Sequence, residues 1–456
     1  MDNFDLAIIG GGPAGYAAAL QGAELGAKVI LVENGPLGGT CVNRGCIPTK
    51  FMGEAAESAR TIDTLQAFGL KGSLEPISLK RVGGRRSALV SGLVDGISSM
   101  LQMGGVEVEF GSARLSGRAA LKIANPDGTR EITATKIIIA TGASPAPLDL
   151  PGLERDEILS AGQAFDLEQV PENLLVVGSD AIALELACIY SGLGSQVTIV
   201  DQESQILSGE DAEMVGILRE LLEQAGVSIH IRSRIESVDV DEQGNRLVGV
   251  FDGQQKRRIV AQRIIVSPRR IPNVTALGLH EVGVVIADGA IVTNSRMETN
   301  VEGIYAAGDV VGEPMLSHIA TAQGRIAASN ALGKEARFSN RIVPRCFYTT
   351  PQLACVGISE EQAQQKGLSV RVGTASLGVS ARAATLARRN GLVKVIVDEA
   401  YGDLLGVHIL SPVASEMIAQ AVLAMNLELT ARDFDQVFQF HPTLAEAVTE
   451  AIRAAR

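Results

Sequence analysis

The fold of this chain follows from one stretch near its start, Asp5-Leu6-Ala7-Ile8-Ile9-Gly10-Gly11-Gly12-Pro13-Ala14-Gly15. The apolar run predicts a buried strand, and the alanine-rich segment that follows, up to Leu25, predicts a helix. Gly10, Gly12 and Gly15 have the G-x-G-x-x-G spacing, which allows a tight turn and lets a pyrophosphate approach the positive end of the helix. The sequence therefore predicts a dinucleotide-binding turn.

An acidic residue stands at the end of the next predicted strand. Residues 28–32 form this strand, and Glu33 follows it, where a carboxylate can hold a ribose hydroxyl. Strand, glycine turn, helix, strand and acid together indicate a nucleotide site more strongly than the glycines alone.

The same pattern recurs in the middle of the chain. Residues 174–177 predict a strand, the turn begins at Gly178, and Asp201 ends the next strand. Gly15 to Glu33 and Ala183 to Asp201 are both separations of 18 residues, so we expect two dinucleotide-binding units of one design. No basic residue directly follows Asp201, which favours a free 2′-hydroxyl and hence NAD over NADP.

The second turn departs from the pattern at its middle glycine, which is replaced by Asp180. This change puts a negative side chain where the pyrophosphate needs to come close. We therefore expect weaker nucleotide binding at the second unit.

Two cysteines that flank four residues follow the first unit, in the run Gly38-Gly39-Thr40-Cys41-Val42-Asn43-Arg44-Gly45-Cys46-Ile47-Pro48-Thr49-Lys50. Pro48 suits the first turn of a helix, so we expect Cys46 in or just before that turn. The helix dipole, Arg44 and Lys50 should lower the pKa of one thiol, and a thiolate is what disulfide exchange needs.

Two other interpretations of the cysteine pair are weaker. A structural disulfide that closes a loop of about six residues would contribute only roughly 2 kcal/mol, and no secretion signal suggests an oxidising compartment. No second close Cys/His pair follows, so no metal site is expected. We expect Cys188, Cys346 and Cys355 to be buried thiols.

Composition limits the class of protein. The chain has 456 residues and a formal net charge of −12, without a long basic run, which argues against nucleic acid as a partner. The uncharged run 6–23 fits a strand, turn and helix better than a membrane span, and Asp2 and Asp5 do not suit a signal peptide. We expect a cytoplasmic protein.

Further strands end at polar turns. Residues 136–140 lead into Thr141 and Gly142, and residues 303–307 lead into Asp309, at the strand end where ligands of open α/β sheets gather. From about Pro344 the chain changes to longer alternating strands and amphipathic helices. This change predicts a separate C-terminal α+β domain.

One histidine near the C-terminus is a candidate base. His441 precedes Thr443 and Glu446, which have capping-box spacing ahead of an apolar helix, so Glu446 also has a structural use. A catalytic role for His441 needs a thiol, which lies some 400 residues earlier. Such a pairing requires a long return of the chain or a second subunit.

These motifs together resemble the flavin-dependent pyridine nucleotide–disulfide oxidoreductases, and within them the dihydrolipoamide dehydrogenase branch. The resemblance covers the whole chain and implies an α/β fold with two Rossmann-like dinucleotide-binding domains and a C-terminal dimerisation domain. The implied limits are 1–149 and 273–338 for the FAD-binding domain, 150–272 for the NAD-binding-like domain and 339–456 for the dimerisation domain.

The resemblance also implies roles for single residues. Cys46 would face the flavin, Cys41 would exchange with the substrate dithiol, and His441 of the second subunit of a homodimer, oriented by Glu446, would take the substrate proton. The residues implied to bind FAD or the second nucleotide are Gly10, Gly12, Gly15, Glu33, Thr40, Lys50, Thr141, Gly142, Gly178, Glu185, Asp201 and Asp309.

Asp180 and Arg269 both replace family glycines on the nicotinamide-nucleotide side, and Gln439 stands where many dihydrolipoamide dehydrogenases have histidine. We expect FAD as cofactor. NAD is the candidate electron acceptor, although Asp180 and Arg269 are unfavourable for its binding. The expected partners are a free or protein-bound lipoyl dithiol, a second copy of the chain, and a lipoyl-carrier protein or complex. The rival hypothesis is a non-catalytic or NAD-independent flavoprotein subunit of a larger complex.

Overall fold

The computed structural model describes residues 2–147, 150–153 and 158–456. Its backbone contacts divide the chain into two compact units. Unit 1 comprises Met1–Thr49, Gly84–Pro147 and Pro268–Ser339, and unit 2 comprises Lys50–Gly83, Leu148–Ser267 and Asn340–Arg456. Two long helices, α3 (Cys46–Thr64) and α4 (Leu79–Met103), contain the first two of the points where the chain passes from one unit to the other.

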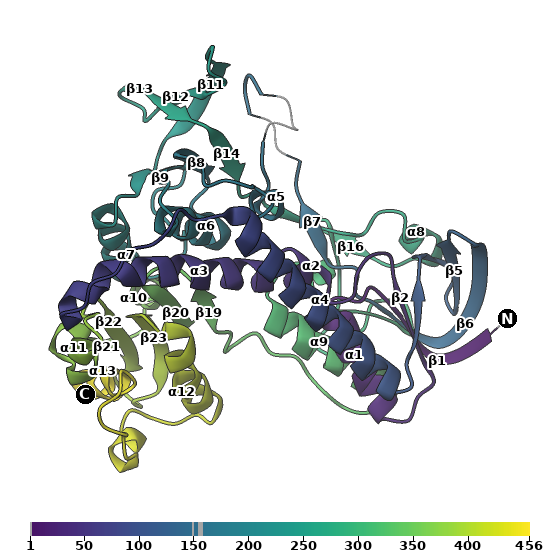
Figure 1. Ribbon diagram of the computed structural model, residues 1–456. Coiled ribbons are helices and arrows are strands. Elements are labelled where there is room, and N and C mark those ends of the chain that lie inside the picture. Colours follow the sequence, from purple (N-terminus) through teal and green to yellow (C-terminus); the bar gives the residue numbers. More distant parts are fainter. Residues whose placement is uncertain (1, 148–149, 154–157) are drawn as a thin grey trace. The chain divides into compact units, whose positions relative to one another are not determined.

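Unit 1 is built on a sheet whose central strands are parallel (Figure 1). Its strand order is β3 (Glu107–Phe110), β2 (Val29–Glu33), β1 (Asp2–Ile9), β6 (Gly128–Ile139), β5 (Ala120–Asn125) and β4 (Ser112–Gly117). β18 (Ile304–Ala306) runs parallel to β6, so a late segment of the chain returns to the first sheet. Parallel strands place their carboxyl ends together, which gathers the turns that follow β1, β6 and β18.

The central strand β1 is buried on both faces because its residues alternate between two cores. Leu6 and Ile8 pack with α1 (Pro13–Glu24) and α9 (Ser317–Ala331), while Ala7 and Ile9 contribute to the core on the other face. α1 and α9 lie side by side in Figure 1. Their approach is close: a Cβ on Gly324 would lie 2.1 Å from the Ala14 carbonyl oxygen.

Smaller elements complete unit 1. They are α2 (Gly39–Asn43), α8 (Leu279–Val282), the antiparallel pair β7 (Ala143–Pro145) with β15 (Arg270–Pro272), and the pair β16 (Ile286–Ala287) with β17 (Ala290–Ile291). The pairing of β15 with β7 brings the segment after residue 268 beside the turn that follows β6.

Unit 2 begins with a second parallel sheet, in the order β10 (Ser228–His230), β9 (Gln196–Val200), β8 (Asn173–Val177) and β14 (Arg263–Val266). α5 (Ala161–Ala164), α6 (Ala181–Gly192) and α7 (Ala212–Gln224) accompany it. An antiparallel sheet of β11 (Arg234–Val240), β12 (Arg246–Phe251) and β13 (Lys256–Ala261) lies between β10 and β14 in the sequence.

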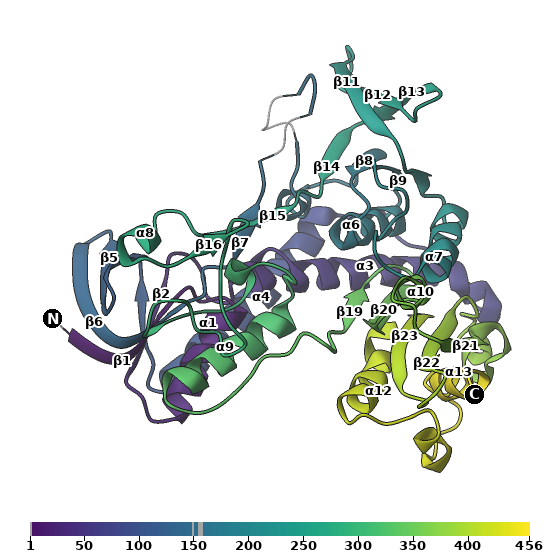
Figure 2. The ribbon, with the colours of Figure 1, turned by 180° about the vertical axis from the view of Figure 1, so that it is seen from behind.

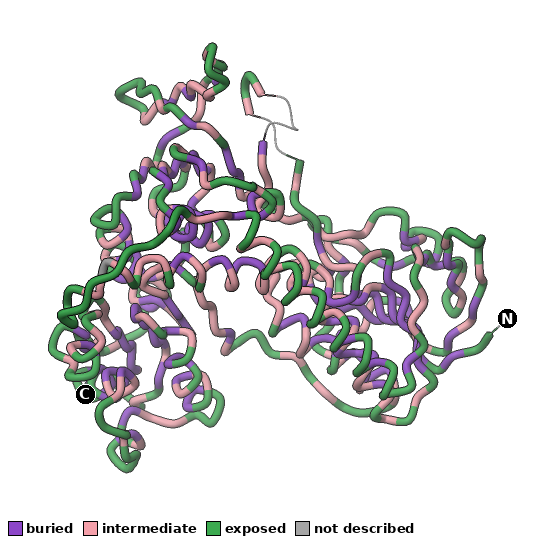
Figure 3. The backbone as a smooth tube through the Cα atoms, in the orientation of Figure 1, coloured by how far each residue is buried: buried purple, intermediate pink, exposed green. Residues whose placement is uncertain are grey.

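The C-terminal part of unit 2 is an antiparallel sheet with helices (Figure 2). Its strand order is β19 (Arg345–Phe347), β20 (Gln352–Gly357), β23 (Leu404–Ser411), β22 (Leu392–Asp398) and β21 (Val370–Ser376). The helices are α10 (Glu360–Gln365), α11 (Ala381–Thr385), α12 (Ala414–Asn426) and α13 (Glu446–Ala454). Figure 3 shows buried backbone along the central strands of each large sheet.

The second parallel sheet and the C-terminal sheet share one core. Leu353, Cys355 and Leu410 of the C-terminal sheet belong to the same buried cluster as α6. The described elements confirm the predicted fold class, an α/β chain with two dinucleotide-binding units and a C-terminal α+β region. The predicted boundary at residue 149 lies outside the described residues. No helix in the described part of the chain is long and apolar enough to cross a membrane.

Candidate active site

The three glycines of the first turn have different surroundings. A Cβ on Gly10 would lie 2.3 Å from the Ala140 carbonyl oxygen, and one on Gly15 would lie 1.7 Å from the Gly10 oxygen. A Cβ on Gly12 would come no closer than 3.8 Å to its nearest neighbour, the Gly39 Cα. Gly10 and Gly15 are therefore required by the packing of the chain on itself, whereas Gly12 leaves open space at the start of α1.

The start of α1 has its N–H groups available to a ligand. Gly12 is the N-cap in extended conformation, no side chain of the described residues caps it, and Pro13 begins the helix. An uncapped helix start next to open space suits an anion such as a diphosphate, because the N–H groups and the helix dipole both favour negative charge. The first turn thus fits a dinucleotide cofactor.

Glu33 is held at the edge of this turn. Its side chain accepts hydrogen bonds from the Gly11 N–H at 2.5 Å and from the Gly35 N–H at 2.7 Å, and the residue is 9% exposed. The two backbone donors fix a carboxylate at the end of β2, where the sequence predicts it.

The two cysteines lie on consecutive short segments that pack against the first turn. Cys41 is in α2 together with Thr40, and Cys46 is the first residue of α3, which confirms the predicted helix start. Both cysteines are half-buried. The Gly38 N–H donates to the Gly11 oxygen at 2.9 Å, and a Cβ on Gly39 would lie 2.7 Å from the Gly12 Cα.

One side chain, Asn43, holds this segment, and another, Tyr16, lies near the thiols. The Asn43 amide donates to the carbonyl oxygens of Leu37 and Gly39, both at 2.9 Å, which holds the loop before α2 closed. Tyr16 of α1 lies near the thiols, and burial, with a smaller contribution from Cys41, raises the pKa of its phenol above the usual value. Sequence reasoning missed Tyr16, which directly follows Gly15 in α1.

Asp309 follows β18 and forms an ion pair. Arg270 Nη1 lies 2.6 Å from Asp309 Oδ2, and Arg270 Nη2 donates to the Ala143 carbonyl oxygen at 3.1 Å. Sequence reasoning singled out Asp309 and missed Arg270, although Arg270 is the neighbour of Arg269, which it did name. The signal is the strand β15, which brings this segment beside β7.

Thr141 and Gly142 lie at the same edge of the first sheet. The Thr141 hydroxyl donates to the Asn273 oxygen at 2.8 Å, and the Asn273 amide donates back to the Thr141 oxygen at 2.9 Å. Gly142 has a φ of 69°, so its backbone conformation favours glycine. Unit 1 therefore brings together Gly10, Gly12, Gly15, Glu33, Thr40, Cys41, Cys46, Thr141, Gly142 and Asp309.

In unit 2, Lys50 and Glu185, both implied to lie at the cofactor, form an ion pair. Lys50 Nζ lies 2.8 Å from Glu185 Oε2, and the same ammonium lies 4.1 Å from the centre of the Tyr348 ring. Glu185 is 5% exposed and also accepts the Tyr348 N–H at 2.9 Å. The buried carboxylate is thus neutralised by one cation, and this cation remains about one third exposed.

The second glycine turn has nearly the same backbone conformation as the first, but an aspartate side chain caps the helix that follows it. Asp180 is the N-cap of α6, and its carboxylate accepts hydrogen bonds from the Ala183 N–H at 2.9 Å and the Ser267 hydroxyl at 2.8 Å. Burial raises the pKa of the Asp180 carboxyl above its usual value despite these hydrogen bonds. Asp201 accepts the Ser179 hydroxyl at 2.5 Å. The Asp180 side chain therefore occupies a helix start that is open in the first turn.

Arg269 belongs to unit 1 and Asp180 to unit 2. Within unit 2, Ser267 and the backbone N–H of Ala183 already serve the Asp180 carboxylate, and Gly178 has the positive φ, 109°, expected of its turn position.

His441 and Glu446 form a pair near the start of α13. His441 Nδ1 lies 3.0 Å from Glu446 Oε1, and the histidine side chain is 70% exposed. Hydrogen bonding from the Thr443 N–H at 2.7 Å, and secondarily His441, keep the pKa of the Glu446 carboxyl below its usual value. An imidazole held at Nδ1 by a carboxylate presents Nε2 to a reacting group.

The predicted capping box forms only in part. Glu446 accepts the Thr443 N–H, but the Thr443 hydroxyl donates to the Phe440 oxygen, and α13 starts at Glu446 rather than directly after Thr443. The half of the box that is missing is that of the Thr443 hydroxyl, so Glu446 keeps the structural use that the spacing predicts, besides its contact with His441.

Comparison with known proteins identifies the family. The family model for pyridine nucleotide-disulphide oxidoreductases matches residues 4–324, and that for their dimerisation domain matches residues 343–452. This chain belongs to that family. The dimerisation domain supports a homodimer.

The relatives extend over the whole chain. A dihydrolipoyl dehydrogenase of Thermus scotoductus is 38% identical and covers 100% of this chain and 98% of its own length. One of Bacillus subtilis is 35% identical, covering 98% and 97%. The crystal structure of LpdA from Mycobacterium tuberculosis superimposes with a TM-score of 0.91 at 29% identity, covering 99% of both chains.

The protein is therefore a flavoprotein disulfide oxidoreductase of the dihydrolipoyl dehydrogenase type, as the sequence predicts. The family confirms the expected FAD and brings NAD(P) as the second nucleotide. The open first turn fits FAD. The second turn fits its nucleotide less well, because the Asp180 carboxylate already caps the helix that would face the diphosphate.

Proposed function

We propose that this protein oxidises a dihydrolipoyl-type dithiol through a redox disulfide of Cys41 and Cys46. The observation that carries the proposal is the packing of the thiol segment on the first turn, through the Gly38 to Gly11 hydrogen bond and the contact of Gly39 with Gly12. FAD, when bound, accepts the two electrons of the reduced thiol pair and passes them on. A thiol pair fixed next to the FAD turn suits this transfer.

In the proposed reaction a substrate thiolate attacks the Cys41 sulfur. The Cys41–Cys46 bond breaks, a mixed disulfide of substrate and Cys41 forms, and Cys46 leaves as a thiolate at the start of α3. The second substrate thiolate then attacks the substrate sulfur of the mixed disulfide. Cys41 is released, the substrate becomes a disulfide, and the helix dipole stabilises the Cys46 anion.

We assign the proton transfer to His441 of a second subunit in a homodimer. Its Nδ1 is held by Glu446 and its ring is exposed, so Nε2 is free to take the first thiol proton from a substrate at another chain's cysteines. Mixed dimers of Cys41→Ser and His441→Ala chains should regain activity, because one shared site then has both groups. If verified heterodimers stay inactive, each chain builds its own site.

The cofactor roles are proposed as the sequence predicts them. Gly10, Gly12, Gly15, Glu33, Thr40, Thr141, Gly142 and Asp309 would hold FAD, with Lys50 and Glu185 beside it, and Gly178 and Asp201 would serve the second nucleotide. We keep 1–149 and 273–338, 150–272, and 339–456 as the domain limits. Arg270 joins the FAD group, because it fixes the Asp309 carboxylate at 2.6 Å.

The electron acceptor is the finer part of the proposal. We propose that NAD is reduced slowly, because the Asp180 carboxylate occupies the helix start and repels a diphosphate. The second candidate function, a flavoprotein that passes electrons to another acceptor within a complex, is favoured by this same residue. The intact cysteine and histidine pairs argue that the protein is catalytic in either case.

Anaerobic titration of the FAD-loaded protein tests both parts. Dihydrolipoamide should bleach the flavin spectrum rapidly, and NADH should do so much more slowly. Absence of reduction by dihydrolipoamide would contradict the dithiol function. Equal rates with NADH and dihydrolipoamide would leave that function standing and remove the proposed block at the second turn.

A further inference from the structure

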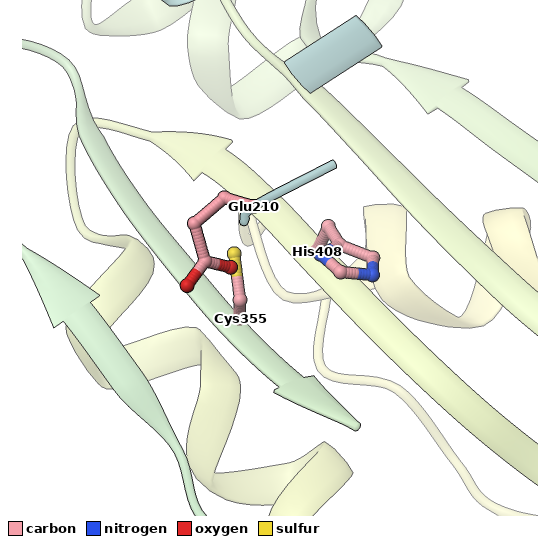
Figure 4. Close-up of side chains that lie close together, drawn as sticks. All are labelled: Glu210, Cys355 and His408. Carbon is pink, nitrogen blue, oxygen red and sulfur yellow. The ribbon is translucent and has the colours of Figure 1, made fainter. Parts of the chain in front are cut away.

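Three side chains in unit 2 that the proposed function does not use gather at one place. They are Glu210, in the loop before α7, Cys355 of β20 and His408 of β23. Each offers one donor atom, and these atoms lie within 4.8 Å of one another. Cys355 and His408 are fully buried, and the Glu210 side chain is 9% exposed. Figure 4 shows the Cys355 sulfur beside the Glu210 carboxylate, with the His408 ring facing them.

The protonation state of His408 is determined by its partner. Nε2 lies 3.0 Å from the Ile358 carbonyl oxygen, and a carbonyl only accepts, so Nε2 carries the hydrogen. Nδ1 is then a bare lone pair, and it is buried without a hydrogen-bond partner among the described residues. A ring nitrogen whose partner nitrogen donates to a backbone carbonyl is the usual arrangement of a metal-ligating histidine.

The carboxylates at and beside the cluster each have a basic partner. Arg345 Nε and Nη2 donate to the two Glu210 oxygens at 2.5 and 2.9 Å, which holds the carboxylate in one orientation. The neighbouring Asp211 pairs separately with Lys394, at 3.1 Å. A divalent cation bound by one thiolate, one carboxylate and a neutral imidazole is neutral together with these three ligands, and the Arg345 guanidinium, whose side chain is 30% exposed, adds one positive charge beside them.

We propose that Glu210, Cys355 and His408 bind a borderline-soft divalent cation of the Zn²⁺ class. Sulfur, imidazole nitrogen and carboxylate oxygen are the donors that Zn²⁺ takes in proteins. On binding, the Cys355 S–H bond breaks, a sulfur–metal bond forms and one proton is released; no electron is transferred. Tetrahedral ligation places donors roughly 3–4 Å apart, so the widest separation in the cluster would close by about 1 Å.

The site would join two parts of unit 2. Glu210 comes from the second dinucleotide-binding unit, and the other two ligands come from the C-terminal sheet. Because the cluster is buried, the ion would enter as the chain folds, and the bound ion would fix the loop before α7 to the sheet. A thiol that only donates to Glu210 is the alternative, and it leaves the lone pair of His408 Nδ1 without a partner.

The test uses the full-length FAD-loaded protein expressed in zinc-supplemented medium, in a Cys41→Ser, Cys46→Ser background that removes the other thiol pair. Zinc retained after dialysis is measured per FAD, and its ligands by X-ray absorption at the zinc edge. We expect about one zinc per chain with sulfur and nitrogen or oxygen ligands. Cys355→Ala should lower retained zinc at least about tenfold, while Cys188→Ala, another buried cysteine of unit 2, should keep it.

The FAD content and the unfolding temperature show whether each variant has folded. If Cys355→Ala does not accumulate as a flavoprotein, His408→Gln provides the same comparison. Retained zinc equal to the parent level in a folded Cys355→Ala or His408→Gln protein would overturn the proposal. So would a parent protein without zinc, or zinc without a sulfur ligand.

Discussion

The two glycine turns of this protein have nearly the same backbone and opposite chemistry. The N-cap residues Gly12 and Asp180 have φ and ψ of −73° and −174° in one turn and −75° and −177° in the other. The first helix start is uncapped and faces open space, whereas the Asp180 carboxylate caps the second. The backbone at the N-cap position is therefore compatible with aspartate. We infer that glycine is needed at this position of the first turn to leave room for the ligand.

The similarity continues into the loop after each acidic residue. The Gly38 N–H donates to the Gly11 oxygen, and the Leu207 N–H donates to the Ser179 oxygen, both at 2.9 Å. After this contact the first unit continues into the Cys41 helix, and the second continues through Glu210 into α7. One local design thus leads to the proposed redox thiols in one unit and to the proposed metal cluster in the other.

The largest expected effect comes from copying the second turn into the first. Gly12→Asp should abolish FAD binding, because the carboxylate would cap α1 and repel the diphosphate; two charges about 4 Å apart interact by about 4 kcal/mol at an effective dielectric constant of 20. Flavin absorbance per chain measures the loss. Gly12→Ser, which caps without charge, is the matched control and should lose less FAD. Full FAD content in the aspartate variant would mean that the comparison is wrong.

The next-largest expected effect distinguishes the proposed roles of Cys41 and Cys46. Cys41→Ser should keep FAD, lose dithiol turnover by several orders of magnitude, and show a long-wavelength absorption band, because Cys46 remains as a thiolate beside the flavin. Cys46→Ser should lose turnover without that band. A band in Cys46→Ser and none in Cys41→Ser would exchange the two roles.

Local sequence signals were sufficient to predict the two glycine turns. They were not sufficient to predict the contacts between residues that are far apart in the sequence. The strand, glycines, helix and Glu33 lie within one short segment, so periodicity and turn chemistry predicted them. The hydrogen bond between Ser267 and Asp180 joins residues 87 positions apart, and the Arg270 pair with Asp309 depends on the pairing of β15 with β7. Such contacts follow from sheet order, which spacing does not give.

The proposed metal cluster shows the same limit more strongly. Its three residues come from a loop and two strands that meet only in the folded unit, so no ligand spacing marks them in the sequence. The partial capping box at Thr443 is the opposite case. The Thr443–Glu446 spacing correctly predicted that Glu446 accepts the Thr443 N–H. The spacing did not predict that the Thr443 hydroxyl donates to the Phe440 oxygen instead of capping the helix.

A smaller effect is expected at the acceptor side. Asp180→Gly together with Arg269→Gly should raise the rate of flavin reduction by NADH at least about tenfold, which corresponds to about 1.4 kcal/mol. Reduction by dihydrolipoamide should stay unchanged, since neither substitution lies in the first glycine turn or in the Cys41–Cys46 segment. Stopped-flow absorbance measures both rates. If the NADH rate does not change, or if the parent already reacts equally fast with both reductants, Asp180 is no obstacle.

The smallest effect concerns the charge of Asp180 alone. Its carboxyl pKa is raised, first by burial, so the folded protein binds this proton more tightly than the unfolded chain does. Stability from this group is therefore lost as pH rises from the ordinary value of 3.8 through the raised value.

Asp180→Asn keeps an oxygen for the Ala183 N–H and for the Ser267 hydroxyl but carries no charge. At pH 7 it should unfold at a temperature equal to that of the parent or higher, by on the order of 1 °C, because it avoids the desolvation cost that raises the pKa of the Asp180 carboxyl. The difference should shrink as pH falls toward 4, where the parent carboxyl becomes protonated. Thermal unfolding of both proteins between pH 4 and pH 7 measures it. A difference that grows on acidification would mean that the ionised carboxylate stabilises the turn, and the second helix start would then prefer an anion as much as the first does.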